Sequence, residues 1–139
     1  MATTVSDVMT RDPETVEVSE PVVEAARRMR DADTGDVIVL DNGRVVGVLT
    51  DRDITIRVVA ENKDLSTPVG EACSASDLQT VGPDTSLDQA VQLMRDNAIR
   101  RLPVVENDRA VGIISLGDLA IELDEDSALA DISAAAPDE

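Results

Sequence analysis

The sequence has no phenylalanine, tyrosine, tryptophan or histidine, and it contains one cysteine and one lysine. Histidine, cysteine and lysine supply many of the nucleophiles, general bases and metal ligands of proteins. Their scarcity argues against an enzyme, so we expect no catalytic residue, no metal site and no cofactor. Cys73 has no partner for an intramolecular disulfide and is interpreted as a small buried hydrophobic residue, with an intermolecular bridge as the alternative.

Positive charge is also scarce. The chain has 12 basic and 29 acidic residues, which gives a formal net charge of −17 at pH 7. This charge repels nucleic acid and anionic membranes, so neither is expected as a partner. No stretch approaches the roughly 18 apolar residues of a membrane-spanning helix, and the N-terminus does not open a signal peptide. We therefore expect a soluble cytoplasmic protein, in which an anionic ligand would need a local cluster of arginines.

The apolar residues that are present are Val, Leu, Ile, Ala and Met, in a chain of 139 residues. This length is sufficient to bury a core. A core of medium-sized, often β-branched side chains suits layers of short helices and strands. The composition therefore favours an α/β architecture.

The sequence matches itself without a gap at an offset of 65 residues. Identical pairs include Met29 with Met94, Gly47 with Gly112 and Asp53 with Asp118. Such self-similarity indicates two copies of one structural unit. The predicted division is a first repeat over 8–65, a linker over 66–72, a second repeat over 73–128 and an acidic C-terminal tail over 129–139.

Each copy has the pattern β-α-β-β-α. Apolar residues at helical spacing predict a helix in each copy that ends near Asp33 or Ala98, with its Met and Ala stripe facing the core. Asn42-Gly43 between two apolar runs predicts a two-residue hairpin turn. The expected strands cover 15–18, 37–40 and 45–49 in the first copy and 80–82, 102–105 and 110–114 in the second. A last helix is expected after Thr50 and another after the aligned Ser115.

Both last helices begin with the same motif, Thr50-x-x-Asp53 and Ser115-x-x-Asp118. This spacing is typical of a capping box, in which the hydroxyl and the carboxylate accept backbone N–H groups. A hydroxyl and free amides at a helix start also suit a phosphate, and an aspartate one turn later can accept hydrogen bonds from ribose hydroxyls. The motif is thus compatible with a cap alone and with a nucleotide site built on a cap.

The stretches "GVLTDRDI", "GIISLGDL" and "RRLPVVE" together resemble a tandem cystathionine-β-synthase (CBS) domain pair, or Bateman module, of the stand-alone bacterial or archaeal kind. The resemblance covers nearly the whole chain. It implies an α/β (α+β) fold with two β-α-β-β-α repeats related by pseudo-two-fold symmetry.

The resemblance also implies a set of ligand-binding residues. Asp53 and Asp118 would bind ribose, and Thr50 and Ser115 would face phosphate. The remaining implied residues fall into three groups: those lining the adenine slot with backbone groups and side chains (Val16, Val81), those forming further walls (Val37, Val48, Leu102, Ile113), and those supplying positive charge (Arg52, Arg100, Arg101). Because copy two has Arg100-Arg101 where copy one has Gly35-Asp36, we expect the two sites to differ.

The function that the resemblance implies is regulatory. A cleft between the repeats would bind AMP, ADP or ATP and transmit a conformational change within a homodimer or to a regulated protein that the sequence does not identify. A similarity to short CBS pairs of the hypoxic-response type suggests a stress role. Two alternative functions remain open. The protein could be a ligand-free scaffold for dimerisation or protein interaction, or a sensor of S-adenosylmethionine or a dinucleotide.

Overall fold

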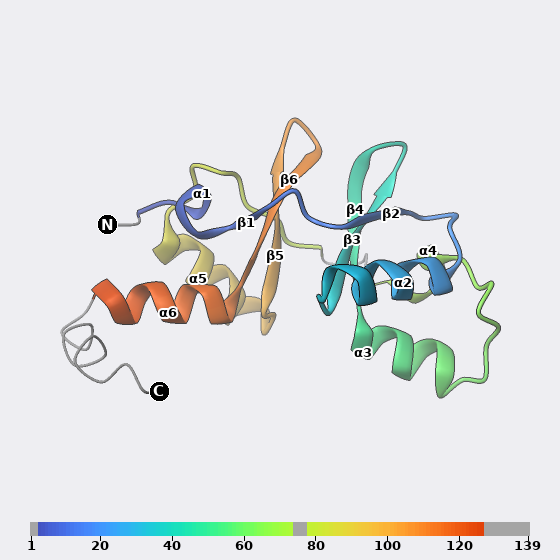
Figure 1. The fold of residues 1–139 in the computed structure, drawn as a ribbon. Helices are drawn as coiled ribbons and strands as arrows, with labels where there is room; N and C mark the ends of the chain where they lie inside the picture. Colours follow the sequence, from blue (N-terminus) through green and yellow to red (C-terminus); the bar gives the residue numbers. More distant parts are fainter. Residues whose placement is uncertain (1–2, 74–77, 127–139) are drawn as a thin grey trace.

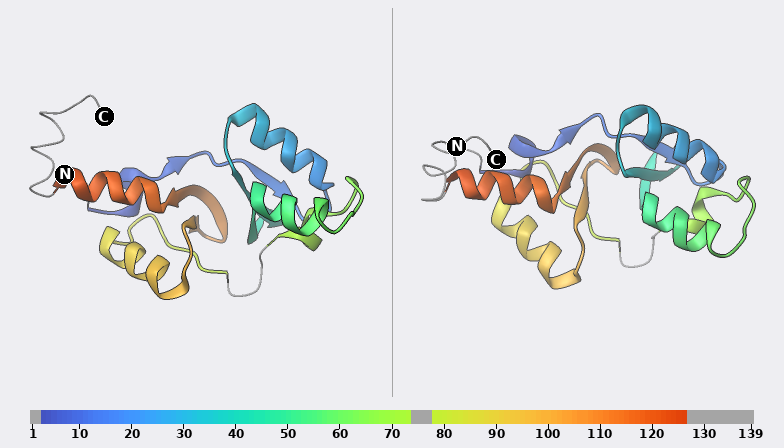
Figure 2. Two further views of the ribbon diagram at one scale, coloured as in Figure 1. Left: turned by 90° about the horizontal axis from the view of Figure 1, so that it is seen from below. Right: turned by 60° about the horizontal axis from the view of Figure 1, so that its bottom comes forward.

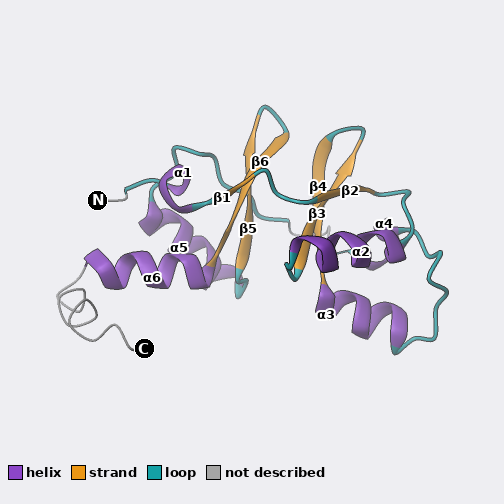
Figure 3. Ribbon diagram, viewed as in Figure 1, coloured by secondary structure: helices purple, strands orange, loops and turns teal. Residues whose placement is uncertain are grey.

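The chain folds into two similar halves that lie side by side, each with a small sheet covered by helices (Figures 1 and 3). The computed structural model describes residues 3–73 and 78–126. The first half contains β2 (Thr15–Glu17), α2 (Val22–Ala32), β3 (Asp36–Asp41), β4 (Arg44–Thr50), α3 (Asp51–Ile54) and a π-helical continuation over Thr55–Val59. The second contains α5 (Leu87–Asn97), β5 (Arg101–Glu106), β6 (Arg109–Ser115) and α6 (Leu116–Asp126). The predicted α/β class with two repeats is confirmed.

The two hairpins have the same turn. Asn42 and Gly43 have φ of 53° and 83°, and the aligned Asn107 and Asp108 have φ of 55° and 66°. Two successive residues with positive φ match the tight turn that suits the twist of a hairpin, and Asn, Asp and Gly tolerate this conformation best. The predicted hairpin is confirmed, and its counterpart in the second repeat uses Asp where the first uses Gly.

The long helices end where the sequence indicates. Asp33 after α2 and Ala98 after α5 both have φ of 54°, the left-handed conformation that stops a helix. The helical stripe faces the core in both repeats, since Ala25 and Met29 of α2 and Ala90 and Met94 of α5 are buried. The one predicted strand that does not form is 80–82. There Val81 makes a single parallel bridge to Val104, because Gly82 and Pro83 end the extended segment at once.

Each repeat is completed by the segment that precedes the other one. The N-terminal α1 (Val5–Val8) and β1 (Thr10–Arg11) join the second repeat, where β1 pairs antiparallel with β6 and Val5 is buried in the core. Figure 2 shows this N-terminal segment running from the second repeat across to the first. Conversely, α4 (Val69–Ala72) packs into the core of the first repeat. The stretch 66–72, expected to link the repeats, thus carries a helix of the first core.

Gly112 in β6 permits the approach of β1. A Cβ at this position would lie 2.5 Å from the Met9 Sδ and 2.9 Å from the Thr10 carbonyl oxygen. Any side chain here would push β1 away from the sheet, so glycine is required by contact rather than by backbone angle.

The described part of the chain contains no helix that is both long and apolar enough to cross a bilayer. The last helix, α6, runs to Asp126. The predicted acidic tail over 129–139 lies outside the described residues.

Candidate functional site

The two Ser/Thr-x-x-Asp motifs form capping boxes. The Asp53 N–H donates to Thr50 Oγ1 at 3.0 Å, and the Thr50 N–H donates to Asp53 Oδ2 at 2.9 Å. In the second repeat, the Asp118 N–H donates to Ser115 Oγ at 3.1 Å, and the Ser115 N–H donates to Asp118 Oδ2 at 3.3 Å. Each motif therefore turns a strand into a helix, as predicted. The capping role uses one carboxylate oxygen of each aspartate.

The first motif faces the second repeat across a cleft of about 540 Å³. Residues from β4 and the start of α3 form one wall, and the segment between α5 and β5 forms the other. The lining residues are Val48, Thr50, Asp51, Arg52, Asp53, Ala98, Ile99, Arg100 and Arg101. Six residues that the CBS resemblance implies are thus brought together: Val48, Thr50, Arg52, Asp53, Arg100 and Arg101.

An ion pair spans the two repeats at this cleft. Arg101 Nε lies 2.5 Å from Asp36 Oδ2, with the two side chains 38% and 16% exposed. The internal duplication aligns Asp36 with Arg101, so one pair of equivalent positions carries opposite charges that meet between the repeats. An anion in the cleft must compete with Asp36 for the Arg101 guanidinium.

The other charges of the cleft alternate in sign. Arg52 and Arg100 are exposed. The Asp51 carboxylate accepts the Arg52 backbone N–H at 2.8 Å, and the Asp51 N–H donates to the Gly35 carbonyl at 2.9 Å. The exposed arginine side chains are free to turn toward a ligand, whereas Asp51 is held beside the Gly35 backbone.

Four of the implied residues lie in the hydrophobic cores instead. Val16 and Val37 are each 1% exposed, Leu102 is fully buried and Val81 is 7% exposed. The alternation of side chains along these short strands points these four toward the helices. These four side chains therefore pack in the cores and do not line the 540 Å³ cleft. The slot role of Val16 and Val81, which includes their backbone groups, and the wall role of Val37 and Leu102 stay predictions.

The remaining three, Ile113, Ser115 and Asp118, lie at the equivalent place in the second repeat, outside the 540 Å³ cleft. Arg101 pairs with Ser115 in the sheet, as Asp36 pairs with Thr50. On that side the residues that correspond to Arg100 and Arg101 are Gly35 and Asp36. The aligned residues thus differ in charge, and the expected difference in ligand binding between the two sites stays a prediction.

Sequence reasoning missed three contributors. Ala98 and Ile99 line the cleft because the left-handed turn at Ala98 swings the chain toward the first repeat. The third contributor is Asp36, which forms an ion pair with Arg101 in the structure, whereas the sequence relates the two residues only by alignment. The opposite charges at duplicated positions were the signal that could have identified the pair.

Cys73 follows α4 and is half-buried against the first core. Burial raises the pKa of its thiol, and the nearby Asp53 carboxylate raises the pKa further while Arg57 opposes this. The neutral thiol is therefore favoured at neutral pH, as suits a small packing residue. Within residues 3–73 and 78–126, no three His, Cys, Asp or Glu side chains are arranged to hold a metal ion.

Comparison with known proteins places the chain in a family. The model of the CBS domain matches it twice, over residues 5–60 and 66–125. The CBS domain-containing protein YhcV of Bacillus subtilis is 43% identical over 117 residues, which cover 84% of this chain and 83% of YhcV. Hypoxic response protein 1 of Mycobacterium tuberculosis is 32% identical over 124 residues, which cover 88% of this chain and 87% of that relative.

A solved structure agrees with this placement. The CBS domain pair of protein MJ0100, crystallised with 5′-methylthioadenosine and S-adenosyl-L-methionine, has a TM-score of 0.80 at 24% identity and covers 91% of this chain and 100% of that one. This likeness shows the shared fold. CBS pairs are in general regulatory rather than catalytic. With two adjacent matches that account for most of its length and a relative of 43% identity, the chain belongs to the CBS domain family and is a tandem CBS pair.

Proposed function

We propose that the cleft between the repeats binds an adenine nucleotide, and that this binding is the signal to which the regulatory module responds. The observation that carries the proposal is the meeting of Thr50 and Asp53 from one repeat with Arg100 and Arg101 from the other. The cleft volume of about 540 Å³ falls in the range of small-molecule sites.

Each part of a nucleotide has a matching group in the cleft. Guanidinium groups of Arg100 and Arg101 suit phosphate oxygens because they donate two parallel hydrogen bonds. Asp53 uses Oδ2 for its cap, and a carboxylate has further lone pairs that can accept ribose hydroxyls. Val48 and Ile99 offer aliphatic contact for the base, since the chain has no aromatic residue to stack on it.

The charges around the cleft favour a ligand with few phosphates. Three arginines (Arg52, Arg100, Arg101) are balanced by three aspartates (Asp36, Asp51, Asp53), and the rest of the protein is strongly acidic. Each added phosphate therefore gains little local attraction and meets more long-range repulsion. We expect AMP to bind more tightly than ADP, and ADP more tightly than ATP.

The signal would pass through the last helices. Ile56 and Ile121 are 48% and 63% exposed, and the duplication aligns them on the two helices that follow the motifs. Equivalent apolar residues on two related helices suit a self-complementary homodimer. A ligand that holds the repeats together would change the relative position of these helices, and thereby the dimer or its contact with a regulated protein.

Purification of the chain offers the first test. Because the chain lacks aromatic residues, it absorbs almost nothing in the near-ultraviolet range where adenine absorbs strongly. A co-purified nucleotide would be visible at once and identifiable by chromatography after denaturation. Calorimetric titration with AMP, ADP and ATP then measures affinity.

Variants locate the binding. Asp53→Asn and Arg101→Ala should each weaken AMP binding about tenfold or more, because the first replaces a charged acceptor by a neutral amide and the second removes a charged donor. Asp118→Asn, the matched change in the second repeat, should have a much smaller effect. Equal losses from Asp53→Asn and Asp118→Asn, or no binding of any of the three nucleotides up to millimolar concentration, would refute the proposal.

S-adenosylmethionine is the second candidate ligand, since the MJ0100 pair was crystallised with this compound and a related thioether. Asp51 and Asp53 suit its positive charge. Tighter binding of S-adenosylmethionine than of AMP would select it. If neither binds and the chain still dimerises, the scaffold interpretation replaces both. The stress role stays a prediction.

A further inference from the structure

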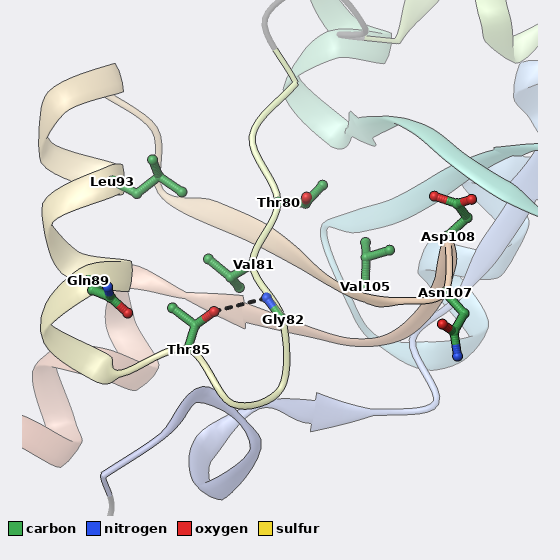
Figure 4. Close-up of a pocket in the computed structure, with 9 residues that line it drawn as sticks. All are labelled: Thr80, Val81, Gly82, Thr85, Gln89, Leu93, Val105, Asn107 and Asp108. Atoms are coloured by element: carbon green, nitrogen blue, oxygen red, sulfur yellow. Dashed lines mark hydrogen bonds between the residues drawn. The ribbon is translucent and has the colours of Figure 1, made fainter.

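A second hollow, of about 570 Å³, lies in the second repeat and shares no residue with the cleft. It is an open surface hollow bordered by the extended segment at Thr80, the first turns of α5 and the turn between β5 and β6 (Figure 4). Leu93 and Val105 form its apolar part, and Thr80, Thr85, Gln89 and Asp108 provide polar groups. We call it the α5 groove.

In the first repeat, an arginine fills the corresponding place. One guanidinium nitrogen of Arg28, Nη1, donates to the Thr15 carbonyl. Its Nη2 lies 3.0 Å from Glu20 Oε1, and its Nε lies 3.4 Å from Glu24 Oε2. Arg28 thereby connects α2 to the outer edge of β2.

The duplication aligns this network with the α5 groove residue by residue. Arg28 corresponds to Leu93, Glu20 to Thr85 and Glu24 to Gln89, while Thr15 corresponds to Thr80. The second repeat therefore has neither the guanidinium nor its two carboxylate partners. The groove is the space that remains.

The central backbone pairing beside this space is kept, since Val81 bridges Val104 as the aligned Val16 pairs with Val39. Val81 exchanges hydrogen bonds with β5, donating to the Pro103 carbonyl at 3.1 Å and accepting from the Val105 N–H at 2.8 Å. Neighbouring groups of an edge segment point the other way, so the Thr80 carbonyl faces outward, like the Thr15 carbonyl that binds Arg28. Among the described residues, no donor is hydrogen-bonded to the Thr80 carbonyl.

We propose that the α5 groove binds the side chain of an arginine from a partner polypeptide, in the place that Arg28 occupies in the first repeat. The Thr80 carbonyl is an outward-facing acceptor, and Asp108, in the turn between β5 and β6, lines the same groove. Leu93 and Val105 suit the aliphatic part of the arginine. The net charge of −17 favours approach of a cationic segment.

Asp108 can leave its present partner, Arg44, and bind an incoming arginine instead. It forms an ion pair with Arg44 at 3.1 Å, but the two side chains are 65% and 69% exposed. Pairs this exposed are weak. Arginine is preferred over lysine because its planar group can donate to two acceptors at once.

The test uses N-acetyl-arginine amide as the probe, followed by NMR of the Leu93 and Val105 methyl groups and the Gly82 amide in the full chain. We expect these signals to shift, with the uncharged citrulline analogue at least about tenfold weaker and the lysine analogue intermediate. Free L-arginine, the other source of the same group, should bind no better than the capped probe. Equal shifts from citrulline, or a clear preference for free arginine, would overturn the assignment to a protein-borne arginine.

Two variants check the site. The triple change Thr85→Glu, Gln89→Glu and Leu93→Arg copies the first repeat and should abolish the shifts while keeping the circular dichroism of the native fold; Leu93→Arg alone serves if the triple variant does not fold. The reverse change, Arg28→Leu, should create a new arginine-responsive site reported by the Glu17 amide. The proposal would be contradicted if the triple variant, or Leu93→Arg alone, folds and the arginine probe still binds to it.

Discussion

The two repeats share a backbone but differ in the charges placed on it. The hairpin turns, helix ends and capping boxes recur at equivalent positions. The polar side chains do not: Asp36 corresponds to Arg101, and the charged Arg28 network corresponds to the open α5 groove. Packing and turn geometry are therefore the same in both copies, whereas the partly buried charged side chains differ from one copy to the other.

The largest expected effect is on stability and concerns Gly112, where β1 pairs with β6. Gly112→Ala should lower the free energy of unfolding by about 2–3 kcal/mol, because the added Cβ collides with Met9 and Thr10 of the inserted segment. Chemical denaturation followed by circular dichroism measures this. Gly117→Ala in α6 is the control; its Cβ would meet Ser115 Oγ at an ordinary 3.7 Å. That helical change should raise stability by about 0.5–1 kcal/mol. Equal stabilities of the two variants would show that β1 is not held tightly.

The next effect concerns the ion pair between the repeats. Asp36→Asn should free Arg101 and raise the affinity for AMP by up to about tenfold, since a hydrogen bond to a charged group is then available to phosphate. Calorimetry measures the change. Asp33→Asn removes the same charge from the exposed end of α2, where asparagine also tolerates the left-handed conformation. An equal gain in Asp33→Asn would mean that net charge, rather than competition for Arg101, limits binding.

A smaller effect comes from making the first repeat resemble the second. Arg28→Leu should lower the free energy of unfolding by about 1 kcal/mol, because the Thr15 carbonyl, Glu20 and Glu24 lose their partner in a partly exposed setting. Denaturation curves check this value. Arg27→Leu removes a neighbouring arginine whose contact with Glu24 is longer, at 3.7 Å, and more exposed. Its stability should stay within about 0.5 kcal/mol of the parent.

The smallest effect involves Cys73, which follows α4 as Met9 follows α1. The raised pKa of the Cys73 thiol means that folding favours its neutral form. This contribution to stability is present below the pKa of the unfolded thiol and is lost as pH rises through the pKa of the folded one. Alkylation by iodoacetamide should therefore be slower in the native chain than in urea at mildly alkaline pH. An equal or faster native rate would contradict the packing role.

Local elements were predictable from sequence because their signals are local. The Asn42-Gly43 turn, the Met and Ala stripe and the capping aspartates act on residues within a few positions of themselves. The pairing of β1 with β6 was not predictable, since a two-residue strand has no pattern that identifies a partner about a hundred residues away.

The candidate site was also predictable in part, because its motif is a local sequence signal. The motif and the CBS resemblance predicted Thr50, Asp53 and the Arg100-Arg101 pair, and the structure brings all four to one cleft. They did not decide which way Val37 and Leu102 point, because the all-apolar runs 37–40 and 102–105 lack the alternation that separates one face of a strand from the other. Asp36 as the partner of Arg101 depended on how the repeats meet, which is a property of tertiary structure.

The placement of α1 and β1 in the second repeat has a consequence for the order in which the chain acquires its structure during synthesis. Because β1 precedes the first repeat, it cannot pair until β6, about a hundred residues later in the chain, has been made. A contact of such long sequence separation slows folding, because loop closure must precede any gain from the contact. The sheet of the first repeat, β2-β3-β4, can form from neighbouring segments while β1 is still unpaired, so the second repeat depends on a segment synthesised before the whole first repeat.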